Sequence, residues 1–368
     1  MKKRILITVL VVLAVLILAP VVYFAYCNMA YRGKEDSAKV AYLENHKFVI
    51  NDKTLDIPQA FGKKIPTGAG RVLIFGEVHG FSPTHLIDSK LLIYLNKNRG
   101  VRTYGAEIYA NDAETLNRII NADSLDVKGL KAVIHDIGKE TPQIETVDCL
   151  KKWEEIYAYN RGVDEGKKIH VVGLLGKRGG NKGLYYDEVM AKSLLDFLQD
   201  TASGELVKNG CYCFVGFAHA LQAPYVVKGE TGPTFASLLK AHHLGVTSMV
   251  QLAINSYCFL PRVLRNMGMP ITPPDEKTKL DNSNGKLSYI TNIINLEKAA
   301  GNAKLAIYAL NGAGTPFNHG NDLVGSKSTM SFIYPPLYAL PQYSTLDYFQ
   351  YVLLINGHDA PQSLLAAR

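Results

Sequence analysis

The feature that most constrains this chain is a run of about 22 uncharged residues from Ile5 to Tyr26. A helix of that length is long enough to cross the ~30 Å hydrocarbon core of a bilayer. Three basic residues at positions 2–4 precede the run, so we expect the N-terminus to stay in the cytoplasm and the rest of the chain to be exported. The run therefore predicts a signal-anchor helix over residues 1–28, a single membrane pass and an extracytoplasmic globular part.

Two other interpretations of this segment stay open. A cleaved signal peptide has an apolar core of about 7–15 residues and a small-x-small cleavage site. The present run is longer, and Phe24–Cys27 makes a poor site. Lipid attachment to Cys27 is disfavoured by the bulky Tyr26 in front of it. An uncleaved anchor fits the run best.

Charge and cysteine usage exclude several classes of protein. The formal net charge is +7, and residues 2–4 carry three of these positive charges. The remaining excess of about +4 is too small to indicate nucleic-acid binding. The five cysteines include no Cys-x-x-Cys pair, which argues against zinc-ribbon and thioredoxin-like chemistry. Cys211 and Cys213 lie in a predicted strand, where we interpret them as small core residues.

Apolar runs alternate with amphipathic segments along most of the chain. Strands are predicted at 71–75, 102–109, 168–175, 211–215 and 246–254, with later ones at 304–310 and 348–355 and an edge strand at 48–50. Helices are predicted at 82–99, 112–120, 149–163, 187–198 and 235–243. This alternation predicts an α/β fold with a mainly parallel central sheet and helices on both faces, preceded by one transmembrane helix.

The predicted domain organisation follows from changes in composition. A juxtamembrane stalk over residues 29–47 leads into a single α/β domain over residues 48–368. Within that domain the polar, proline-rich stretch at about 261–300 is interpreted as a lid-like insertion. An aromatic, proline-rich segment from Tyr334 to Tyr343 is interpreted as a loop.

Two predicted strands end in the same way, with a Gly-x-x-His motif. The first motif spans Gly76–His79 and also contains Glu77; the second spans Gly216–His219. Glu107 ends the neighbouring strand in an otherwise apolar run. Because parallel sheets place their sites at the carboxyl ends of strands, we expect these side chains to meet in one crevice.

This set of side chains is suited to two kinds of chemistry. His79, His219 and Glu107 are suitable ligands for a divalent metal such as zinc, manganese or cobalt, with Glu77 as an acid/base or further ligand. The same residues also suit hydrolysis without a metal, in which a histidine acts as general base and a carboxylate orients it. The catalytic candidates are therefore Glu77, His79, Glu107 and His219.

The two motifs and Glu107 resemble those of the Tiki/TraB/ChaN-like and erythromycin-esterase superfamily. The segment Tyr186–Ala191 is also similar to its Arg-Asp-x-x-Met-Ala element, with Tyr186 in place of the arginine. The resemblance covers about 72–254. It implies a metal-dependent protease using His79, His219 and Glu107 or Glu77, an esterase with His79 as base, or a haem-binding protein without turnover.

We therefore carry three functions forward from the sequence. The first is a membrane-tethered, metal-dependent hydrolase of peptide, amide or ester bonds; the second is a haem- or iron-binding protein; the third is an inactive scaffold. Asp187 is interpreted as a helix cap, and His85 as a residue that either lines the site or lies at the surface. The expected partners are the membrane and a peptide or small-molecule substrate, with no nucleic acid; the oligomeric state is open.

Overall fold

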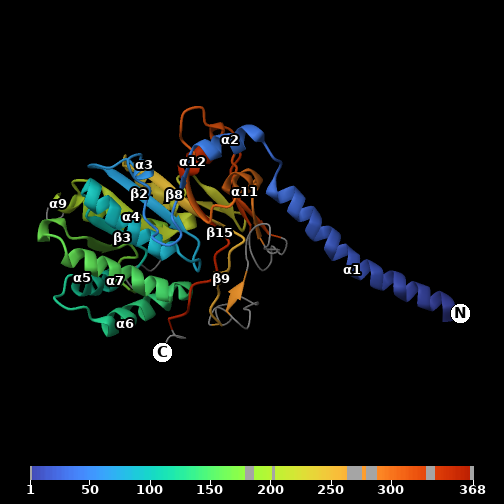
Figure 1. Ribbon diagram of the computed structural model, residues 1–368, viewed down its shortest axis with the longest axis horizontal. Coiled ribbons are helices and arrows are strands. Elements are labelled where there is room, and N and C mark those ends of the chain that lie inside the picture. The colour runs from blue at the N-terminus through green and yellow to red at the C-terminus, as the bar shows by residue number, and fades with distance from the viewer. Residues whose placement is uncertain are drawn as a thin grey trace.

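The computed structural model describes residues 2–178, 186–200, 204–262, 276–278, 288–328 and 336–364. Its centre is an eight-stranded sheet in the order β1-β12-β15-β8-β2-β5-β3-β4 (Figure 1). In this order the strands are Lys47–Val49, Leu305–Ala309, Tyr351–Asn356, Gly245–Ile254, Arg71–Glu77, Cys211–Gly216, Thr103–Ala106 and His170–Gly173. The sheet therefore contains all eight strands predicted from the sequence.

The sheet is largely parallel, as predicted. The strands from β15 through β8, β2, β5 and β3 to β4 all run in one direction. Only β12 runs the other way, and it pairs antiparallel with β15 on one side and with the edge strand β1 on the other. β2 lies in the middle, between β5 and β8, so its carboxyl end opens at the centre of the sheet edge where a site is expected.

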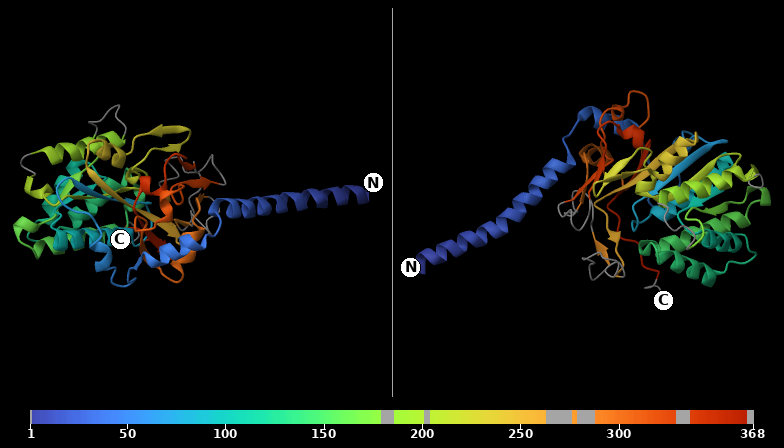
Figure 2. Two further views of the ribbon diagram at one scale, coloured as in Figure 1. Left: turned by 90° about the horizontal axis from the view of Figure 1, so that it is seen from above. Right: turned by 180° about the vertical axis from the view of Figure 1, so that it is seen from behind.

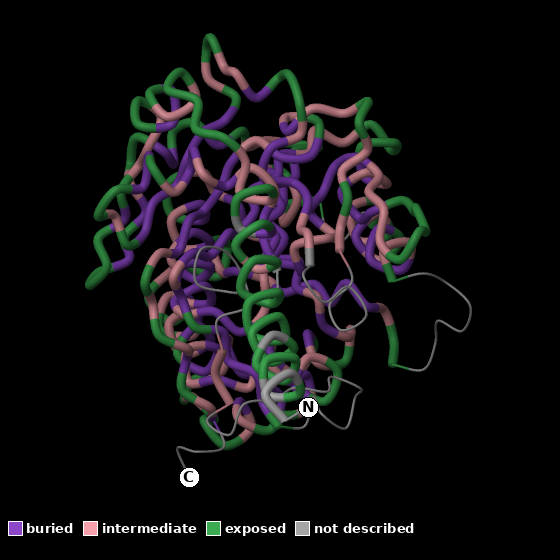
Figure 3. The backbone as a smooth tube through the Cα atoms, turned by 90° about the vertical axis from the view of Figure 1, so that its right-hand side faces the viewer, coloured by how far each residue is buried: buried purple, intermediate pink, exposed green. Residues whose placement is uncertain are grey.

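Helices cover both faces of the sheet, because β2 is apolar on both sides. Leu73 and Phe75 pack into the core under α4 to α7, whereas Val72 and Ile74 pack into the core under the helices of the other face. The first set is α4 Thr84–Arg99, α5 Ala110–Ile120, α6 Val127–Gly138 and α7 Val147–Arg161. The second set is α2 Ser37–Asn45, α8 Tyr186–Gln199, α10 Phe235–Ala241 and α11 Ile294–Ala300. Figure 3 shows buried residues in the interior of the globular body and exposed residues around its outside.

A second, five-stranded sheet lies beside the first, in the order β11-β13-β14-β6-β7. Its strands are Ser288–Ile290, Ser326–Ser328, Leu337–Ala339, Tyr225–Val227 and Glu230–Gly232, and every pairing is antiparallel. β14 falls where the sequence predicted an aromatic, proline-rich loop, and that prediction was wrong for residues 337–339. Because each strand is only three residues long, its apolar pattern is too short to be recognised.

The N-terminal helix α1, Lys2–Arg32, projects from the globular body as a rod (Figures 1 and 2). Its most apolar stretch has a mean hydropathy of 2.9 and is not buried against the rest of the chain. By length and composition, α1 is one helix able to cross a membrane. α2 follows inside the predicted stalk and buries Tyr42 and Leu43 in the core.

The remaining elements are short. They are the helices α3 Gln59–Gly62, α9 Gly204–Val207 and α12 Thr345–Tyr348, the 3-10 turns η1 Pro142–Ile144, η2 Glu165–Lys167, η4 Phe217–Ala220 and η7 Pro316–Asn318, and the strand pair β9 Cys258–Phe259 and β10 Lys277–Thr278. In the proline-rich insertion at 261–300, residues 263–275 and 279–287 lie outside the described residues. No disulfide joins any of the five cysteines, all of which are described and buried.

Candidate active site at the carboxyl ends of three strands

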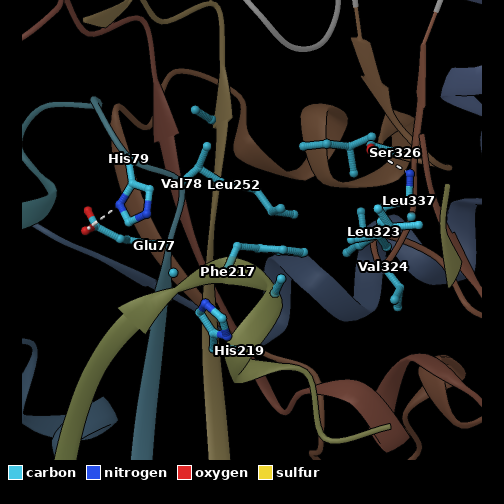
Figure 4. Close-up of a pocket in the computed structure, with 16 residues that line it drawn as sticks. Glu77, Val78, His79, Phe217, His219, Leu252, Leu323, Val324, Ser326 and Leu337 are labelled. Atoms are coloured by element: carbon cyan, nitrogen blue, oxygen red, sulfur yellow. Dashed lines mark hydrogen bonds and ion pairs between the residues drawn. The ribbon is translucent and has the colours of Figure 1, made fainter. Parts of the chain in front are cut away.

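The four predicted site residues come together at one edge of the central sheet, and Figure 4 shows three of them, Glu77, His79 and His219. Glu77 is the last residue of β2, and His79 follows it in the loop. Glu107 comes directly after β3, and His219 lies in η4 directly after β5. Because β5 pairs with both β2 and β3, these three strand ends are neighbours in the sheet.

Glu77 and His79 form the first carboxylate–imidazole pair. His79 Nδ1 lies 3.0 Å from Glu77 Oε1, and only 4% of Glu77 is exposed. Burial alone would raise the pKa of Glu77, but the nearby His85 and His79 imidazoles outweigh burial and lower it. Glu77 is therefore a carboxylate that accepts a hydrogen bond from His79 Nδ1, which leaves Nε2 of His79 available as a base. Burial would likewise lower the pKa of His79, but the Glu77 carboxylate raises it above 6.5.

His219 is held between two carboxylates. Its Nδ1 lies 2.8 Å from Asp187 Oδ1, and its Nε2 lies 3.5 Å from Glu107 Oε1. Burial would lower the pKa of His219, but Glu107 and Asp187 outweigh it and raise that pKa to about 10. The same contact, together with a 2.6 Å hydrogen bond from the Gly216 N–H, lowers the pKa of Glu107 to about 2 against the effect of burial. At neutral pH, His219 is therefore a cation that lies between Asp187 and Glu107.

The glycines of the two motifs allow these pairs to approach each other. A methyl group on Gly216 would lie 3.4 Å from His79 Nε2, from His219 Cδ2 and from Glu107 Oε2, so the three side chains surround one point. A methyl group on Gly76 would lie only 2.5 Å from Ala220 Cβ, inside the turn that carries His219. Each glycine therefore creates space, one for the turn and one at the centre of the site.

The site opens into a pocket of about 360 Å³. In Figure 4, Glu77, His79 and His219 lie at one end, Phe217 and Leu252 lie in the middle, and residues of the second sheet lie at the other end. A pocket of this size with a few polar groups among apolar ones is typical of small-molecule sites.

Behind this pocket lies a second, smaller chamber with buried polar side chains. It is a cavity of about 40 Å³, lined by Glu77, His79, Glu107, His85 and Lys152 among others. Glu77 Oε2 and both ring nitrogens of His85 have no hydrogen-bond partner among the described residues, and His85 Nε2 lies 4.0 Å from Glu77 Oε2. Burial outweighs the nearby Glu77 carboxylate and lowers the pKa of His85.

A buried ion pair anchors the helices that close this chamber. Lys152 of α7 lies 2.5 Å from Asp88 of α4, and their side chains are 4% and 0% exposed. The hydroxyl groups of Tyr104 and Tyr212, on β3 and β5, donate to the Asp88 carboxylate at 2.6 and 2.7 Å. The Lys152 ammonium also lies 4.5 Å from the centre of the Phe214 ring. The pair thus ties two helices to two strands of the sheet.

The sequence did not identify every polar residue of this region. Asp187 lies in the first turn of α8, where a carboxylate is explained by the helix itself, yet its side chain accepts from His219 and from the Phe235 N–H. The similarity of Tyr186–Ala191 to a recurrent family segment was the one signal that pointed to it. Asp88 and Lys152 gave no signal, because charged residues of amphipathic helices usually face water.

The predicted metal ligands do not form an open ligand set in this arrangement. Among the residues that the structure describes, no group of three or more His, Cys, Asp and Glu side chains is placed to hold a metal ion. Both nitrogens of His219 face carboxylate oxygens, and Nδ1 of His79 faces Glu77. Metal binding by His79, His219 and Glu107 stays a prediction, and so does binding of haem.

Comparison with known proteins adds information about the fold. No protein-family model matches the chain, and no curated protein matches it. Among solved structures it is similar to a Bacillus cereus protein (10% identity, TM-score 0.57) and to a succinoglycan biosynthesis protein (12% identity, TM-score 0.56), each match covering 90% of this chain and 100% of the other. An erythromycin esterase in its open conformation also matches, at 11% identity and a TM-score of 0.44, over 80% of this chain and 92% of that one. The first two similarities show a shared α/β architecture, whereas the third is too low to indicate even that, and family membership stays a prediction.

Proposed function

We propose that this chain is a membrane-tethered hydrolase of carboxylic esters or amides, including peptide bonds. The observation that carries the proposal is the convergence of two anchored imidazoles at one point in a pocket. His79 presents Nε2 to that point, and the His219 ring lies equally close to it. Each ring is held through Nδ1 by a carboxylate, Glu77 for His79 and Asp187 for His219. This is the geometry that general acid–base catalysis requires.

In the proposed mechanism, His79 is the general base. A water molecule attacks the substrate carbonyl and gives a proton to Nε2, while Nδ1–H remains bonded to Glu77. Collapse of the tetrahedral intermediate breaks the bond to the leaving alcohol or amine, which takes the proton back from His79. The products are a carboxylic acid and an alcohol or amine, so one water is consumed in each turnover.

His219 has the complementary role in this mechanism. With its pKa raised to about 10, its ring stays an imidazolium throughout the neutral range. In the proposed mechanism its Nε2–H, which lies 3.5 Å from Glu107 Oε1, turns to the negative oxygen of the tetrahedral intermediate as that charge develops. Asp187 and Glu107 are positioning residues that keep this ring charged and oriented.

The tether in this proposal is α1. The basic residues at 2–4 support an orientation with the start of α1 in the cytoplasm and the globular body on the other side. A reporter phosphatase that is active only outside the cytoplasm, fused after Arg368, tests this orientation. Activity of the fusion is expected, and an inactive fusion at normal protein levels would contradict the orientation.

The catalytic proposal is tested with the full chain in lipid nanodiscs and p-nitrophenyl acetate as substrate. His79→Gln is expected to lower kcat/KM by about 10²–10⁴-fold, which is the range for loss of a general base. His135→Ala is the control. His135 is a half-exposed histidine of α6 that pairs with Glu145 and lies outside the pocket. Equal loss of activity in both variants, or none in His79→Gln, would overturn the assignment of His79.

A chelator distinguishes this mechanism from the metal-dependent one. Dialysis against EDTA is expected to leave the rate unchanged. Loss of activity that zinc, manganese or cobalt restores would support His79, His219 and Glu107 as metal ligands instead. Failure to hydrolyse any ester or peptide, together with a Soret shift at micromolar haem, would favour the haem-binding alternative.

A further inference from the structure

The far end of the pocket is formed by the second sheet, and its lining is almost entirely apolar. The lining side chains from this sheet and the turn before β13 are Val227, Ile290, Leu323, Val324, Ser326 and Leu337. Figure 4 shows Leu323, Val324 and Leu337 together at the end of the pocket opposite His79. We call this set the apolar wall.

The polar groups in and beside the apolar wall make hydrogen bonds within the protein. The Ser326 hydroxyl accepts a hydrogen bond from the Leu337 N–H at 3.3 Å. The Gly325 carbonyl accepts from the Thr291 N–H at 2.9 Å, and the Gly325 N–H donates to the Thr291 hydroxyl at 3.2 Å. A polar substrate group placed against the wall would lose its bonds to water and gain few in return, whereas an apolar group would gain by leaving water.

One residue of the apolar wall is held there against the preference of its backbone. Leu323 has φ +68°, in the left-handed region that glycine and asparagine adopt easily and leucine does not. Its side chain nevertheless lines the pocket, and it is 1% exposed. The fold therefore places a large apolar side chain at a position where the backbone favours a small or polar residue.

The apolar wall is also joined to the end of α1. The Tyr31 carbonyl at that end accepts from the Asn292 N–H at 3.1 Å, and the Tyr31 ring packs edge-on against Tyr289 of β11, with centroids 5.9 Å apart. Tyr289 is the neighbour of Ile290, which lines the pocket. The apolar end of the pocket is thus tied directly to the segment that leaves the membrane in the proposed arrangement.

We propose that the substrate is an acyl ester or acyl amide whose long apolar chain lies along the apolar wall, with its carbonyl between His79 and His219. This inference rests on the proposed hydrolase function and names its substrate class. The polar end of the pocket carries the chemistry, and the apolar wall selects the acyl chain. A membrane lipid or a lipid-modified molecule has this chemistry, and α1 keeps the pocket close to such a chain.

The test compares p-nitrophenyl acetate, butyrate, hexanoate and octanoate, hydrolysed by the full chain in nanodiscs. Each buried CH₂ group is expected to raise kcat/KM by about fourfold until the wall is covered. Because esters also partition into the nanodisc lipid, the rise is compared with that of a wall variant in identical nanodiscs, where partitioning is the same.

The wall variant is Leu337→Thr, which puts a hydroxyl group into the wall and keeps a residue suited to a strand. It is expected to lower kcat/KM for octanoate about tenfold more than kcat/KM for acetate, since roughly two CH₂ contacts are lost or made polar. Tyr338→Thr is the matched control, because Tyr338 is the next residue of β14, does not line the pocket and is 46% exposed. It should leave the whole series unchanged.

The outcomes separate this inference from the function on which it rests. If His79→Gln hydrolyses every ester as fast as the unchanged chain does, the proposed function is overturned. Two outcomes would overturn the acyl-chain assignment alone. One is hydrolysis that depends on His79 but does not rise with chain length. The other is the same dependence on chain length in Leu337→Thr as in the unchanged chain. Faster cleavage of a leucine p-nitroanilide peptide than of the octanoate would replace the acyl chain by an apolar peptide side chain.

Discussion

Two sheets meet at the pocket, and the ionisable side chains that line it come from the central sheet. The central sheet brings Glu77, His79 and His219 from the carboxyl ends of parallel strands, and the five-stranded sheet brings the apolar wall. A parallel strand ends in a loop whose residues are not committed to pairing, so polar side chains can be placed there. The strands of the small antiparallel sheet pair across their length, so their contribution to the pocket comes from side chains.

The two sheets also differ in what lies behind them. Behind the charged end is a chamber with buried polar groups, from His85 to the Lys152–Asp88 pair. Behind the apolar wall is a continuous hydrophobic core that includes Leu323 and Val324. A charge at a site needs other polar groups to hold it in place, whereas an apolar surface needs only packing.

The largest expected effect is on stability, behind the charged end. Lys152→Met leaves the Asp88 carboxylate buried with only the two tyrosine hydroxyl groups, and we expect the free energy of unfolding to fall by about 3–5 kcal/mol. Urea denaturation of the full chain in nanodiscs measures this. Lys139→Met is the control, because Lys139 and Asp136 form an exposed pair worth at most about 1 kcal/mol. Similar losses in both variants would mean that the buried pair has no special structural role.

The next effect is on activity at the point where the imidazoles converge. Gly216 has φ −61°, which any residue adopts, so Gly216→Ala introduces no backbone strain. Its methyl group would lie between His79 and His219, where the attacking water must be, and we expect kcat/KM for p-nitrophenyl acetate to fall by about 10²-fold. Gly166→Ala, with no atom near the new methyl group, should have no effect. Full activity of Gly216→Ala would show that the reaction occurs elsewhere.

These first two predictions concern residues that the sequence revealed unequally. His79 and His219 could be predicted because each follows an apolar run that ends in glycine, and the polarity of the parallel strands then places both at one edge. Asp187 could not be assigned to His219, because a carboxylate in the first turn of a helix already has a local explanation. Lys152 and Asp88 look like solvent-facing residues of amphipathic helices until the packing of α4 on α7 is known. The apolar wall was hidden for another reason: its strands are three residues long and pair only through the tertiary fold.

A smaller effect concerns pH and the charge of His219. Its pKa in the folded chain, about 10, lies above its ordinary value of 6.5. The charge therefore stabilises the fold fully below about pH 6.5, and this contribution is lost as the pH rises through about 10. We expect ester hydrolysis to rise as His79 loses its proton above pH 6.5 and to fall only near pH 10.

Asp187→Asn removes one of the two anions that hold this charge. The alkaline fall in the kcat/KM profile should then move to lower pH by about one to three pH units, the range for loss of a close opposite charge. Glu205→Gln serves as the control, since Glu205 of the exposed helix α9 pairs with Lys208, which follows that helix. An alkaline limb that stays near pH 10 in Asp187→Asn would mean that Asp187 does not set the charge of His219.

The smallest expected effect lies at the joint between α1 and the apolar wall. Arg32, the last residue of α1, pairs with Glu297 of α11, and their side chains are 25% and 10% exposed. Because water screens this pair in part, Arg32→Gln should lower the free energy of unfolding by no more than about 1 kcal/mol.

If the joint serves to hold the wall beside the membrane, the same change should slow hydrolysis of acyl lipid in the nanodisc while leaving soluble p-nitrophenyl octanoate unaffected. Lys298→Gln is the control and should change neither rate. Lys298 lies on α11, like Glu297, and forms an exposed pair with Glu35. Equal slowing of both substrates in Arg32→Gln would show that the joint supports the pocket itself and not its approach to the membrane.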